Sequence, residues 1–113
     1  MEQIKEVMRQ MINVSEVELN DFLSGASIKT FKRQEIISQP NSIPNEIFFI
    51  NKGIVRVLIS DSEGAEHTIH FALENQFVAV YSTFIQKKPS LYTLQTLEET
   101  QVVVLQRAAI DWG

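Results

Sequence analysis

A chain of 113 residues that is 44% hydrophobic is long enough for one compact domain with a buried core. The absence of cysteine excludes disulfides, thiolate nucleophiles and cysteine-based zinc sites. Ten Lys and Arg against fourteen Asp and Glu give a net charge of −4, which disfavours binding to duplex DNA. Because no apolar run approaches the roughly 20 residues of a membrane span and no signal peptide begins the chain, we expect a cytoplasmic protein.

The first 25 residues are predicted to be helical. Apolar residues at helical spacing are Ile4, Val7, Met8, Met11 and Ile12. Ser15 and Glu18 have the spacing of a capping box, which predicts that a second helix starts there. Gly25 is then well placed to cap the end of that helix.

From Ile28 onward the pattern changes to short β segments separated by turns. The predicted strands are SIKTFKR, EIIS, EIFFI, IVRVLIS, AEHTIHFAL, LYTLQTL and QVVVLQ. Asn51 and Gly53 of NKG predict a tight hairpin turn between EIFFI and IVRVLIS, and DSEG predicts the next turn. Several short strands in succession are typical of an antiparallel sandwich or barrel.

No residue pattern predicts a metal site, a catalytic residue or a cofactor, so we do not expect an enzyme. His67 and His70 are three apart on a predicted strand and should face opposite sides of the sheet, where they cannot share one ion. His70 would share a solvent-facing side with Glu66 and Thr68. The serines lack a base-and-orienter setting, and no glycine-rich phosphate loop is present.

Arg56 is the one charged residue inside a strongly apolar strand. In IVRVLIS it should lie opposite the core residues Val55 and Val57, on the same face as Ile54 and Leu58. We favour an arginine that covers apolar surface with its stem over one that binds a ligand.

The order of these elements resembles the cyclic-nucleotide-binding domain, and more specifically the sensor domain of Crp/Fnr-type transcription regulators. IFFINKGIVRVLISDSEGAEHTI and LQTLEETQVVVL carry the resemblance, which covers roughly residues 19–112. It implies a mainly β fold, a double-stranded β-helix or jelly roll, within a single domain over residues 1–113. Residues 1–25 would form its N-terminal helices, 27–106 the jelly roll, and 107–113 the start of a C-terminal helix.

The resemblance also locates a phosphate-binding segment, here called the cassette (residues 77–92). Nucleotide-binding members of the family hold the ribose with a Gly-Glu pair and the phosphate with an arginine. Phe77 matches the family, but the pair falls on Ala79 and Val80 and the arginine position on Ser90. Since a charge-assisted hydrogen bond contributes about 1.5–3 kcal/mol, the loss of both anchors should cost several decades of affinity. Lys88 is a candidate anion contact, although lysine lacks the guanidinium fork.

An effector that does bind should therefore be neutral or weakly polar. The candidate pocket comprises Phe77, Val78, Ala79, Val80, Tyr81, Ser82, Ser90, Leu91 and Tyr92. Sparse polar groups in an apolar lining are usual for small-molecule sites. The alternative is that large side chains such as Leu91 and Tyr92 collapse and fill the space.

The resemblance implies a sensor domain of a Crp/Fnr-like regulator that does not bind cAMP or cGMP in the usual way and whose small-molecule effector is unidentified. Family members continue into a dimerisation helix and a helix-turn-helix domain. A full-length regulator would thus form homodimers and bind DNA, and this chain is either a fragment of one or lacks the output module. The alternatives are a cupin-like jelly-roll enzyme, disfavoured by the missing His-x-His pair, and a protein-interaction scaffold.

We predict that the 113-residue chain alone does not bind duplex DNA specifically, because its net charge is −4 and it contains no helix-turn-helix pattern. A mobility-shift assay with a candidate promoter at physiological salt is the measurement. Sequence-selective retardation of that promoter over a scrambled duplex would contradict the prediction.

Overall fold

The computed structural model describes residues 1–38, 46–79 and 92–106. Two helices come first, α1 (Glu2–Met11) and α2 (Glu16–Leu23). The strands of the described ranges are β1 (Ser27–Phe31), β2 (Ile36–Ser38), β3 (Glu46–Lys52), β4 (Val55–Ser60), β5 (Glu66–Ala72), β6 (Phe77–Val78), β7 (Thr93–Thr96) and β8 (Thr100–Gln106). They form two antiparallel sheets, sheet A in the order β1-β8-β3-β6 and sheet B in the order β2-β7-β4-β5. The predicted jelly roll is confirmed.

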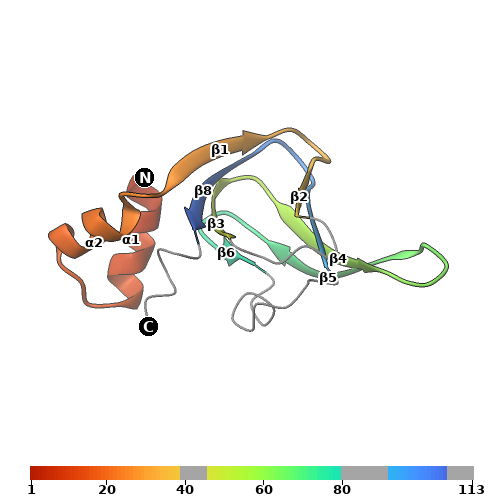
Figure 1. Ribbon diagram of the computed structural model, residues 1–113, viewed down its shortest axis with the longest axis horizontal. Helices are drawn as coiled ribbons and strands as arrows, with labels where there is room; N and C mark the ends of the chain where they lie inside the picture. Colours follow the sequence, from red (N-terminus) through yellow and green to blue (C-terminus); the bar gives the residue numbers. More distant parts are fainter. Residues whose placement is uncertain (39–45, 80–91, 107–113) are drawn as a thin grey trace.

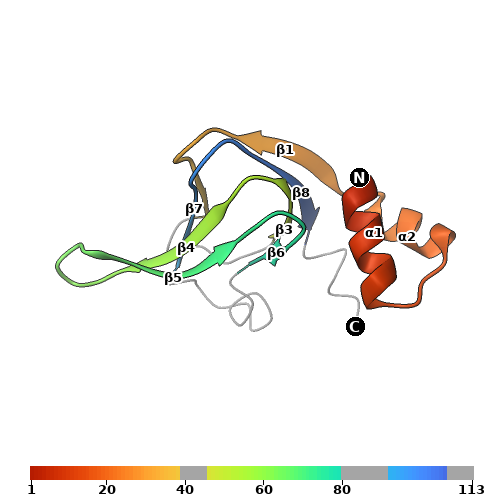
Figure 2. The same cartoon turned by 180° about the vertical axis from the view of Figure 1, so that it is seen from behind.

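The molecule has three layers, with sheet A in the middle. Both helices lie against one side of sheet A, and the long β4–β5 hairpin projects from the opposite end of the molecule (Figures 1 and 2). On β3, Phe48 and Ile50 enter the core between the two sheets, whereas Phe49 points to the helices. Because both faces of sheet A are covered, its central strands are nearly continuous apolar runs.

Two hydrophobic clusters follow from this layering. The inter-sheet cluster comprises Phe31, Phe48, Ile50, Val55, Val57, Ala72, Val78, Leu94, Val102 and Val104. The helix–sheet cluster comprises Ile4, Leu23, Phe49, Val103 and Leu105. Successive residues of β8 alternate between the two clusters, as the two-residue period of a strand requires.

The hairpin predicted at NKG is wrong. β3 belongs to sheet A and β4 to sheet B, so Gly53 turns the chain from one sheet to the other. Gly53 has φ +115°, and a Cβ there would lie 2.8 Å from the Cα of Thr100. The turn chemistry was read correctly, but turn residues alone do not reveal whether the flanking strands pair. The turn at DSEG does join paired strands, β4 and β5, with Gly64 at φ +85°.

The helix ends differ in how well the sequence predicted them. The capping box at the start of α2 is confirmed: the Ser15 hydroxyl accepts from the Glu18 N–H, and the Glu18 carboxylate accepts from the Ser15 N–H. The hydrogen bonds from Ser15 hold the pKa of Glu18 below its usual value. The Gly25 cap is wrong in kind, because Gly25 is not among the residues with positive φ. Instead the Ser24 hydroxyl donates to the Asp21 carbonyl.

The glycines predict a graded series of stability losses on replacement by alanine. Gly53→Ala should cost about 2 kcal/mol or more, because it adds backbone strain to a clash with the backbone of Thr100. Gly64→Ala, with positive φ but open space, should cost about 1–2 kcal/mol. Gly25→Ala, the control with open space and no positive φ, should change stability by less than about 0.5 kcal/mol. Urea unfolding measures the order, and an equal loss at Gly53 and Gly25 would contradict it.

Candidate functional site

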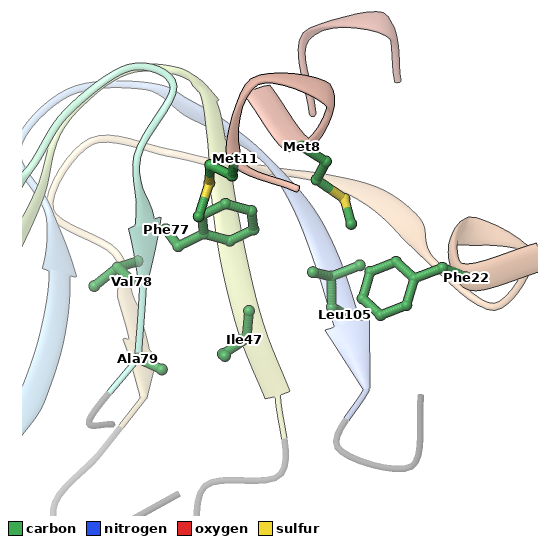
Figure 3. Close-up of a pocket in the computed structure, with 8 residues that line it drawn as sticks. All are labelled: Met8, Met11, Phe22, Ile47, Phe77, Val78, Ala79 and Leu105. Atoms are coloured by element: carbon green, nitrogen blue, oxygen red, sulfur yellow. The ribbon is translucent and has the colours of Figure 1, made fainter. Parts of the chain in front are cut away.

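An apolar groove lies between the helices and the outer face of sheet A (Figure 3). Its cavity volume is about 380 Å³, within the range of small-molecule sites. It is lined by Met8, Met11, Phe22, Ile47, Phe77, Val78, Ala79 and Leu105. Every lining side chain is apolar, so the groove suits a neutral ligand and offers no counter-charge to an anion.

The floor of the groove follows from strand register. Ile47 of β3 pairs with Leu105 of β8, and both side chains face the helices. Phe49, one pair further along, meets Phe77 of the edge strand β6 in an edge-to-face contact with ring centroids 5.0 Å apart. Alternation along the strands therefore places one apolar row under the helices.

The walls of the groove are fixed by helix α1. The Gln3 amide donates to the Asn51 carbonyl at 2.9 Å and to the Asn75 side-chain oxygen at 2.8 Å, which ties the start of α1 to the turns of sheet A. Toward its other end α1 presents Met8 and Met11 to the cavity. Methionine adapts its shape to irregular ligands, because its side chain is unbranched and flexible.

The charged side chains of the helical layer bind one another. Arg9 forms ion pairs with Glu6 at 3.3 Å and with Glu16 at 2.9 Å. The hydrogen bond from Arg9 lowers the pKa of Glu16. These pairs consume the charge nearest in sequence to Met8 and Met11, so the groove mouth gains no free cation from Arg9.

The described part of the candidate pocket is divided between the two faces of sheet A. Phe77 lies with the helix–sheet cluster, Val78 is buried in the inter-sheet cluster, and Val78 and Ala79 also line the groove. Tyr92 is half-buried and packs against the inter-sheet cluster. Six predicted residues lie outside the described ranges, namely Val80, Tyr81, Ser82, Lys88, Ser90 and Leu91.

Sequence reasoning missed five of the groove residues, Met8, Met11, Phe22, Ile47 and Leu105. Their helical or strand periodicity was visible, and it was assigned to core packing. The available signal was an excess of apolar surface on α1, where Met11 remains 66% exposed. An exposed methionine that continues a buried stripe indicates that the stripe extends beyond the core.

The predicted face of His70 is wrong. β5 contains a bulge, so that His70 pairs with Val57 whereas Thr68 pairs with Leu58. His70 therefore shares a face with buried Ala72 and not with Thr68, although it remains exposed on the edge strand. A bulge inserts one residue and reverses the alternation beyond it, which the sequence does not show.

The other polar candidates are occupied by contacts within the protein. His67 lies 2.9 Å from the Asp61 carboxylate at the tip of the β4–β5 hairpin, and this contact, with backbone hydrogen bonds, lowers the pKa of Asp61. Within residues 1–38, 46–79 and 92–106, no three His, Asp or Glu side chains gather to hold a metal ion. No helix in these ranges is long and apolar enough to cross a membrane.

The comparisons identify the family. The family model described as the cyclic nucleotide-binding domain matches residues 28–112, and the chain belongs to this family. The predicted resemblance to that domain is confirmed. No curated protein sequence matches the chain significantly.

Solved structures share this fold at low identity. The sensor domain of the transcriptional regulator DNR from Pseudomonas aeruginosa has a TM-score of 0.78 and 16% identity over 95% of this chain and 67% of that one. The catabolite activator protein of Thermus thermophilus has a TM-score of 0.74 and 14% identity, over 87% and 46%. A regulatory subunit of a cAMP-independent protein kinase A from Trypanosoma cruzi, bound to guanosine, has 0.77 and 14%, over 88% and 35%. The chain thus spans less than half of the last two proteins.

We predict that the groove binds a neutral apolar dye such as Nile red, and that Met11→Lys weakens this binding roughly threefold to tenfold by removing apolar contact. Dye fluorescence titration is the measurement. The matched control is Val17→Lys, because Val17 is 70% exposed on α2 and does not line the groove. Equal dye affinity in the two variants would show that the dye binds elsewhere.

Proposed function

We propose that the chain is the sensor domain of a Crp/Fnr-like transcription regulator whose effector is neutral or weakly polar. One observation carries the proposal: the described start of the cassette, Phe77 to Ala79, lines an apolar groove of about 380 Å³. The similarity to the DNR sensor domain and to a catabolite activator protein supports the regulator class.

The chemistry of the cassette supports the effector class. Family members that bind cyclic nucleotides need a carboxylate and a guanidinium, and this chain has Val80 and Ser90 at those positions. A phosphate buried without a cation costs several kcal/mol, of the order of 3–5. The kinase subunit from Trypanosoma cruzi, described as cAMP-independent, is bound to guanosine, a nucleoside without phosphate. A domain of this fold thus accommodates an uncharged ligand.

In this role the chain is a cytoplasmic binding module and not an enzyme. Effector binding beside Met8 and Phe77 would change the packing between α1 and β6, which would serve as its output. Homodimerisation and DNA binding would then belong to a full-length regulator. A cupin-like enzyme is not favoured, because the described residues bring together no metal-binding group.

We predict that cAMP and cGMP bind with dissociation constants weaker than about 1 mM, because several decades of affinity are lost with the two anchors. Isothermal titration calorimetry is the measurement. The double variant Val80→Glu/Ser90→Arg should regain part of the affinity, whereas the control variant Val80→Gln/Ser90→Gln should not. A micromolar dissociation constant for the unchanged chain would contradict the proposed effector class.

A thermal-shift screen of nucleosides and neutral metabolites tests the function itself. A hit should raise the melting temperature of the unchanged chain and of Val17→Lys, and raise it less in Met11→Lys. A hit unaffected by Met11→Lys would contradict the groove as the effector site. If no neutral compound and no cyclic nucleotide binds, the scaffold alternative replaces the sensor proposal.

A further inference from the structure

The outer face of sheet B carries exposed apolar side chains. The helices cover the outer face of sheet A, and no described helix or strand covers the corresponding face of sheet B (Figures 1 and 2). Phe71 is 49% exposed, Leu73 46% and Ile36 40%. Sheet faces of this kind usually meet another layer, because their apolar surface is otherwise left in water.

Four residues form one row across all four strands of sheet B. Ile36 of β2 pairs with Gln95 of β7, Gln95 with Arg56 of β4, and Arg56 with Phe71 of β5. Paired residues of antiparallel strands lie on the same face. Val55 and Val57 flank Arg56 and are both buried in the inter-sheet cluster, so the row faces away from the core.

The centre of this row is polar but carries no unpaired charge. The Arg56 guanidinium donates to Thr68 Oγ1 at 2.6 Å, to Gln95 Oε1 at 3.2 Å and to Glu66 Oε1 at 3.2 Å. The Arg56 side chain is only 19% exposed. Its charge is thus balanced by Glu66, and a partner could cover it without leaving a lone cation buried.

We propose that this row is a docking surface for a second copy of the chain, in a face-to-face dimer of two B sheets. The proposal goes beyond the sensor function and does not depend on it. The row reads apolar, polar, polar, apolar from Ile36 to Phe71. A two-fold axis parallel to the strands, between β7 and β4, places Ile36 against the partner's Phe71 and Gln95 against the partner's Arg56. The row is therefore self-complementary, which an isologous interface requires.

Other partners fit this surface less well. The net charge of −4 disfavours an anionic lipid surface, and the neighbouring hairpin tip adds Asp61 and Glu63. Leu73 lies two residues beyond Phe71 and extends the apolar flank of the row. A second copy supplies the same flank in the opposite direction, so both ends of the row are covered.

Introduced cysteines test this register, because the chain has none of its own. Ile36→Cys and Phe71→Cys proteins are mixed, oxidised and analysed on a non-reducing gel and by intact mass. The mixture should form a disulfide-linked heterodimer, and each variant alone should form several-fold less. In one chain the two positions are three strands apart, about 14 Å, too far for a disulfide, which needs a Cα separation of about 4.4–6.8 Å. Any disulfide in the double variant is therefore intermolecular.

The control mixture is Ile12→Cys with Phe71→Cys, since Ile12 is 50% exposed at the end of α1 and far from the row in Figure 1. Phe71→Glu should weaken dimerisation roughly tenfold in sedimentation equilibrium, and the control Val17→Glu should not. Circular dichroism confirms that each variant is folded. Equal cross-linking in the control mixture, stronger linking by either variant alone, or a monomer at every concentration tested would overturn the proposal.

Discussion

Burial of sheet A on both faces is the constraint on which the rest of the structure depends. β3 and β8 alternate between two clusters, so each strand carries apolar side chains on both sides. Each fully buried Val, Leu or Phe contributes about 1.5–3 kcal/mol. Without α1 and α2, the row that contains Phe49, Val103 and Leu105 would face water. The helices are thus an obligatory layer of the fold, and the groove is the part of their contact with sheet A that remains unfilled.

This constraint also explains why the cassette would be coupled to the helices. β6 is the edge strand of sheet A and contains only two residues, Phe77 and Val78. Its pleat directs Phe77 to the helices and Val78 to the inter-sheet core. A displacement of this short strand therefore changes packing on both sides of the sheet at once. A ligand beside β6 would act on two clusters, whereas a ligand on the β4–β5 hairpin would meet neither.

The sequence predicted local structure well and pairing poorly. The helical stripe, the capping box at Ser15 and the positions of most strands follow from periodicity and turn residues, which are local properties. The two-sheet corner at Gly53 and the bulge that reverses His70 depend on which strands meet, and no local pattern encodes that. The groove was missed for the same reason, because Met8 and Ile47 come together only through the packing of α1 on β3. The family resemblance supplied the topology that the residues alone left open.

The treatment of charge is consistent across the described molecule. Arg9 is paired with glutamates on the helices, Arg56 is held by Glu66 on sheet B, and His67 contacts Asp61 at the hairpin tip. None of these groups lines the groove. A charge that is already paired gains little from a ligand anion, because the ligand must first replace a hydrogen-bonded carboxylate. The described residues therefore offer an effector contact area and shape, and selectivity among effectors would rest on fit to an apolar lining.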